Sequence, residues 1–93
     1  MKSVTGRIAY FTFNKVGIPD KYFWVDPPEG KGFFCKGRQI PGKELTAGLM
    51  LQLTGDWKIN QNPKYRYIGP QFYFTSYEII SSEGYVFYSR LIS

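Results

Sequence analysis

Hydrophobic and polar residues alternate along this chain in short stretches, which are separated by clusters of glycine, proline and polar residues. Alternation with a period of two, bounded by turn residues, is typical of β-strands. It predicts strands at residues 3–13, 21–26, 33–38, 49–59 and 71–80. A single helical turn fits best at 43–47. A sixth apolar run, residues 85–92, is either an edge strand or a contact between two copies of the chain.

The lengths and order of these strands predict a fold. The first strand is long, and Gly6 inside it is a position where a strand can bend. A hairpin, a short link and a second hairpin follow. This order describes an all-β, five-stranded Greek-key barrel of the oligonucleotide-binding (OB) type, with the sixth run as an added C-terminal strand. An SH3-like barrel is the rival, but the long first strand favours the OB barrel. We expect residues 1–93 to form this one domain.

The alternation also separates an inner from an outer side of the strands. The apolar side is expected to line the barrel, together with leucines of the fourth strand: Phe23, Val25, Phe33, Cys35, Leu49, Leu51 and Leu53. The opposite side forms an outer strip of aromatic and cationic residues: Tyr22, Trp24, Phe34, Lys36 and Arg38. Exposed aromatic residues usually mark a binding surface, but packing against the sixth run or a second subunit is the alternative. A register error of one residue would exchange the two sides.

The end of the fourth strand and the loop after it carry a second cluster of cations and rings. Its members are Trp57, Lys58, Lys64, Tyr65, Arg66 and Tyr67. Loops on barrels commonly carry function. Trp57 has two equal interpretations, a lid over the barrel or a direct ligand contact. The two tyrosines favour ligand contact, because a loop has little core for them to fill.

Composition points to a polyanionic partner. The chain has 12 Lys and Arg against 7 Asp and Glu, a net charge of +5, and 19% of its residues are aromatic. Single-stranded nucleic acid is bound by aromatic rings that stack on bases and by cations that neutralise phosphates. Ordinary solubility charge is the alternative explanation of the basic balance.

Catalytic, metal and cofactor chemistry find little support in the sequence. The chain has no His and one Cys, which excludes disulfide scaffolds and His-based acid–base chemistry within one chain. Its seven acids are scattered, and no phosphate-binding GxxxxGK[ST] loop occurs. Cys35 is expected to be inert packing, since no base is at hand. We therefore expect a non-enzymatic protein without a metal or cofactor. No apolar run has the length of a membrane span. The lone Cys35 and the lack of a recognisable targeting segment lead us to expect a cytoplasmic location.

Several short motifs resemble the OB-like domain at the N-terminus of long-form RecD-like DNA helicases, which also occurs in relatives linked to plasmid conjugation. The similarity runs over residues 4–78 and rests on turn residues and aromatics: Val4-Thr5-Gly6, Phe13-Asn14, Gly37, Pro41-Gly42-Lys43-Glu44-Leu45, Leu53-Thr54-Gly55-Asp56-Trp57, Asn62-Pro63-Lys64-Tyr65 and Gly69-Pro70-Gln71-Phe72. The chain departs from the family by inserting Arg66-Tyr67-Ile68 before Gly69, and it contains no helicase motor. The resemblance implies a free-standing accessory module of a phage or mobile element.

Two functions follow as expectations. The first is single-stranded DNA (or RNA) binding through the outer strip and the cluster after the fourth strand. The second is a protein-interaction module that docks on a helicase, a nuclease or a defence enzyme through the same aromatic residues. In addition, the run 85–92 would form the contact of a homodimer if it is not an edge strand.

Overall fold

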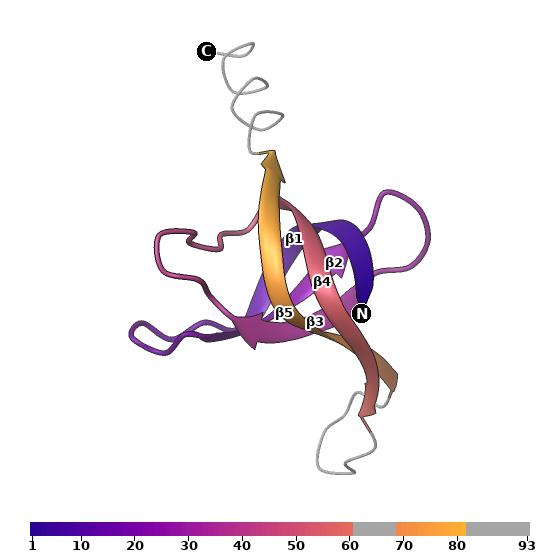
Figure 1. Ribbon diagram of the computed structural model, residues 1–93, viewed down its shortest axis with the longest axis horizontal. Coiled ribbons are helices and arrows are strands. Elements are labelled where there is room, and N and C mark those ends of the chain that lie inside the picture. The colour runs from indigo at the N-terminus through magenta and orange to yellow at the C-terminus, as the bar shows by residue number, and fades with distance from the viewer. Residues whose placement is uncertain (61–68, 82–93) are drawn as a thin grey trace.

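The computed structural model describes residues 1–60 and 69–81 (Figure 1). Two sequence predictions lie outside the described residues. One is the loop cluster of Lys64, Tyr65, Arg66 and Tyr67, and the other is the sixth apolar run, residues 85–92.

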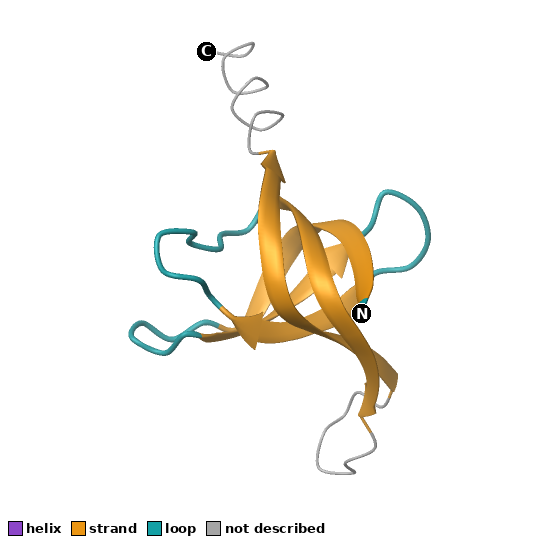
Figure 2. Ribbon diagram, viewed as in Figure 1, coloured by secondary structure: helices purple, strands orange, loops and turns teal. Residues whose placement is uncertain are grey.

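The described part of the chain consists of strands and their connections, and it contains no helix (Figure 2). The five predicted strands are confirmed, with small changes at their ends: β1 (Lys2–Phe13), β2 (Asp20–Asp26), β3 (Phe33–Arg38), β4 (Met50–Asn60) and β5 (Gly69–Ser81).

These strands form a closed barrel in the order β1-β2-β3-β5-β4, and β4 pairs back onto β1. Neighbours are antiparallel except β3 and β5, which run parallel. The order is that of the predicted five-stranded Greek-key barrel. The connection between β2 and β3 emerges on one side of the barrel, and the β1–β2 and β3–β4 connections emerge on the opposite side (Figure 1).

Closure of the barrel depends on β1, which pairs with two different strands. Its first half, from Lys2 to Arg7, pairs with β4, and its second half, from Arg7 onward, pairs with β2. Gly6 lies at this change of partner. A Cβ atom there would lie 2.2 Å from Cγ1 of Val25 and 3.1 Å from the carbonyl oxygen of Asp26. Glycine is favoured at this position because the next strand approaches too closely for a side chain, whereas the irregularities in the pairing of β1 with β2 lie further along, between Ile8 and Tyr10 and between Phe11 and Phe13.

The core fills the barrel with large apolar side chains: Ile8, Phe23, Val25, Phe33, Cys35, Leu45, Leu51, Leu53, Phe72, Phe74 and Tyr77. Six of the seven predicted interior residues are among them. The prediction was wrong for Leu49, which is only half-buried because it precedes the first residue of β4 and packs against the margin of the core.

The predicted helical turn at 43–47 is also wrong. Ile40 and Lys43 instead form an isolated antiparallel bridge across the turn at Gly42, where φ is +82°. The backbone N–H of Leu45 donates to Oε1 of Gln39 at 2.9 Å. Leu45 is buried in the core, and this side-chain capping of its backbone replaces a helical hydrogen bond.

Candidate functional site

The outer sides of β2, β3, β5 and β4 form one continuous surface, which we call the outer face. The strand registers align its residues in two rows across the four strands. One row is Tyr22, Lys36, Tyr73 and Asp56, and the other is Trp24, Phe34, Gln71 and Lys58. The predicted outer strip on β2 and β3 therefore does lie on the side opposite the core, and β5 and β4 extend it.

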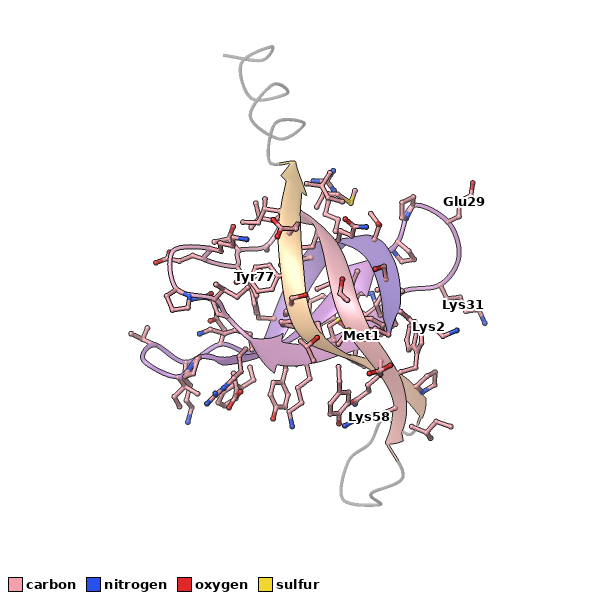
Figure 3. The ribbon with its side chains drawn as sticks, viewed as in Figure 1. Met1, Lys2, Glu29, Lys31, Lys58 and Tyr77 are labelled. Carbon is pink, nitrogen blue, oxygen red and sulfur yellow. The ribbon has the colours of Figure 1, made fainter. Side chains whose placement is uncertain are left out.

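Rings and ammonium groups alternate along the outer face. The Nζ atom of Lys36 lies 4.8 Å from the ring centroid of Tyr22 and 5.6 Å from that of Tyr73. From β4, the neighbour of β5 on its other edge, Nζ of Lys58 lies 4.8 Å from the centroid of the same ring. Cations at these distances are attracted to the face of an aromatic ring. Tyr73 is therefore flanked by two cations, and Lys58, labelled in Figure 3, marks the β4 side of this arrangement.

Electrostatics keep Lys36 charged. A hydrogen bond with Tyr22 raises the pKa of Lys36, and the charges of Tyr22, Tyr73 and Asp20 raise it further, whereas partial burial opposes them. The upward direction means that Lys36 carries its positive charge throughout the neutral range. A cation between two tyrosines is thus a permanent feature of the outer face near pH 7.

Trp24 faces outward as predicted, but its neighbours hold it on several sides. Its ring is stacked on Tyr10 with centroids 6.3 Å apart and meets Phe34 edge-on at 4.6 Å. Its Nε1–H donates to Oδ1 of Asp26 at 2.9 Å. Gly32 leaves room for the indole, since a Cβ atom at that position would lie 2.4 Å from Nε1. Trp24 is half-buried, and the neighbours that cover part of it belong to β1, β2 and β3 of the barrel itself.

Arg38 is exposed at the end of β3 and lies 3.6 Å from Oδ1 of Asp20 on the neighbouring strand. Because both side chains are largely in solvent, this ion pair contributes little to stability. The guanidinium extends the line of cations on the outer face beyond Lys36.

Trp57 lies on the other side of β4 from Lys58. It is 39% exposed, and its ring meets the buried rings of Phe33 and Phe72 edge-on at 5.0 and 5.1 Å. It also lines a pocket of about 530 Å³ between the start of β1 and the β2–β3 connection, next to Pro28. Trp57 therefore covers the end of the barrel while exposing part of its ring, and it does not join the outer face.

The sequence interpretation missed Tyr73, although it is the residue that links the cations. Gln71, Tyr73 and Thr75 alternate with the buried Phe72 and Phe74, so the pattern does place Tyr73 on the outer side. Its position beside Lys36 depends on the parallel pairing of β3 with β5. That pairing joins segments more than thirty residues apart and leaves no local signal in the sequence.

Cys35 is buried between β2 and β5, as the inward assignment predicted. Burial raises the pKa of its thiol far above the ordinary range, which disfavours the thiolate.

Among the described residues, no three His, Cys, Asp or Glu side chains gather closely enough to hold a metal ion. That part of the chain also has no helix long and apolar enough to cross a membrane.

Comparisons of the chain with protein-family models, with curated proteins and with solved structures found no match.

Proposed function

We propose that this protein is a non-enzymatic binder of single-stranded nucleic acid, with DNA as the first ligand to test, and that the outer face holds the strand. The observation that carries the proposal is the position of Tyr73, whose ring is flanked by Nζ of Lys58 at 4.8 Å and Nζ of Lys36 at 5.6 Å. A ring between two cations matches the repeating chemistry of a single strand, in which each base lies between two phosphates.

The arrangement supports this ligand energetically. A base that stacks on an aromatic side chain contributes about 1–3 kcal/mol, whichever base it is. Each phosphate that Lys or Arg neutralises releases a counterion, which favours binding most at low salt. Tyr22 and Tyr73 supply rings on one row of the face, and Lys36, Lys58 and Arg38 supply the cations.

Two sequence features agree with the proposal. The net charge of +5 attracts polyanions over the whole surface. The sequence also resembles the barrel domain of RecD-like helicases, which act on DNA. We include membership of that group in the proposal. The cations and rings of the cluster that includes Lys64 and Arg66 remain part of the proposal as further contacts to the strand.

A titration of a fluorescently labelled oligo-dT with the protein at low salt tests the proposal by fluorescence anisotropy. We expect saturable binding, with Tyr73→Ala weakening the affinity by about fivefold or more, the loss of one stacked base. Tyr73→Phe is the matched control, because it keeps the ring and should retain the affinity.

Absence of binding by the folded wild-type protein at low salt would overturn the proposal. It would favour the docking of a protein partner on the same aromatic residues. An equal loss in Tyr73→Ala and Tyr73→Phe would also count against stacking on this ring.

A further inference from the structure

A pocket of about 430 Å³ opens on the outer face where β3 and β5 part. Among the described residues, parallel pairing joins these strands only from Phe34 to Lys36 on β3, opposite residues 71–73 of β5. The next residues on each strand, including Arg38 and Thr75, line the pocket. The pocket therefore lies at the point where the pairing of β3 with β5 ends.

Aromatic surface and positive charge meet in this pocket. Tyr73 lines it, and the ring of Phe74, which is 5% exposed, adds apolar surface from the core. Lys36 and Lys58, the two cations beside Tyr73, also line the pocket. A flat ligand with an anionic group on either side fits this combination, and one nucleotide of a single strand has that form.

Two carboxylates line the same pocket, and phosphate binding alone does not explain them. Asp20 already has a cationic partner in Arg38, at 3.6 Å. Asp56 lies directly opposite Tyr73 in the register of β4 and β5. Its ion pair is with the N-terminal amino group at 4.0 Å, and both groups are more than half exposed. Because such a pair is weak in solvent, a ligand that donates a hydrogen bond can replace it.

From these positions we propose that the pocket takes one unpaired base, which stacks on Tyr73 and donates its amino hydrogen to the carboxylate of Asp56, so that cytosine is preferred over uracil. This inference rests on the proposed function. The two bases have the same shape, but cytosine presents an amino donor at the position where uracil presents a carbonyl acceptor. A carboxylate pairs with the first and repels the second.

The test compares the affinities of labelled oligo-dC and oligo-dU of equal length at pH 8, for the full chain and two variants. We expect the wild type to bind oligo-dC about fivefold more tightly, near the lower end of the discrimination by one polar contact to a base edge. Asp56→Asn adds an amide donor and should reduce this ratio to below twofold. Glu44→Gln changes the net charge equally at an exposed site outside the pocket, and should keep the ratio.

The outcomes separate this inference from the proposed function. Equal affinity of the wild type for the two oligonucleotides would overturn the base preference and leave single-strand binding standing. A ratio that persists in Asp56→Asn would overturn the role of Asp56. Failure of the folded wild type to bind either oligonucleotide would overturn the proposed function itself.

Discussion

The hydroxyl of Tyr77 donates a 2.6 Å hydrogen bond to the backbone carbonyl of Lys43. The same oxygen accepts a 2.7 Å hydrogen bond from the backbone N–H of Ile40. Tyr77 is buried on β5, and both partners belong to the connection between β3 and β4 (Figure 3). One side chain therefore joins both sides of the turn between β3 and β4 to the barrel wall.

Tyr77→Phe should lower the free energy of unfolding by about 1–3 kcal/mol, because the Ile40 N–H and the Lys43 carbonyl lose their shared partner. Urea unfolding measures the change. Tyr10→Phe, which removes the hydroxyl of a half-exposed tyrosine, is the control and should have little effect. Equal stability of Tyr77→Phe and wild type would show that water replaces both hydrogen bonds.

Two glycines should differ in how they tolerate alanine. At Gly6 the nearest obstacle to a Cβ atom is a methyl group of Val25, whereas at Gly55 it is the backbone carbonyl oxygen of Tyr73, only 2.0 Å away. A side chain moves more easily than a paired strand. Gly6→Ala should therefore cost about 1–3 kcal/mol, typical of overpacking, and Gly55→Ala should cost more. Thermal unfolding of the two variants ranks them, and the reverse order would contradict this account.

Local patterns in the sequence predicted the strands and the two sides of β2 and β3. Phe23 is buried and Tyr22 is not, because side chains alternate strictly in a strand whose inner side faces an apolar core. The special role of Gly6 was predictable for a similar reason, since glycine inside a long strand indicates a close approach or a kink, and the structure shows the close approach. These features depend on neighbours in the chain.

Features that depend on distant segments were not predictable. The position of Tyr73 next to Lys36 arises from the parallel pairing of β3 and β5. The helical turn at 43–47 was wrong because burial of Leu45 and the hydrogen bond from Gln39 override local preference. Tertiary contacts decide conformation where intrinsic propensity is weak.

Alkaline pH should destabilise the protein through Cys35. Burial raises the pKa of its thiol in the folded state, so above pH 9, the ordinary value, the unfolded chain releases a proton that the folded chain retains. The contribution of the Cys35 thiol to the free energy of unfolding is fully present below pH 9. Above pH 9 it decreases by about 1.4 kcal/mol per pH unit. Urea unfolding at pH 8, 9 and 10 should show a smaller decline for Cys35→Ala than for wild type. Parallel curves would contradict the assignment.

Trp24→Ala should affect stability more than binding. The substitution removes the ring contacts with Tyr10 and Phe34 and the hydrogen bond to Asp26. Aromatic pairs contribute about 0.5–1.5 kcal/mol each beyond their buried area, so we expect a loss of about 2 kcal/mol or more. Urea unfolding measures this loss, and an oligonucleotide titration of the folded variant should show a smaller decrease in affinity than for Tyr73→Ala. The opposite ranking would make Trp24 the main stacking platform.

Replacing both Lys36 and Lys58 by Ala should flatten the salt dependence of oligonucleotide binding. For single strands, each neutralised phosphate adds about 0.7 to the slope of log affinity against log salt, so the double variant should lose about 1.4 if each lysine holds one phosphate. Anisotropy titrations at four salt concentrations give the slope.

The control replaces two lysines outside the two rows of the outer face. Lys2 and Lys31 are exposed there, and replacing both by Ala removes the same charge. If the outer face holds the strand, this control pair lowers the affinity slightly and leaves the slope nearly unchanged. Equal flattening by both pairs would mean that the strand is attracted by net charge and does not occupy the face around Tyr73.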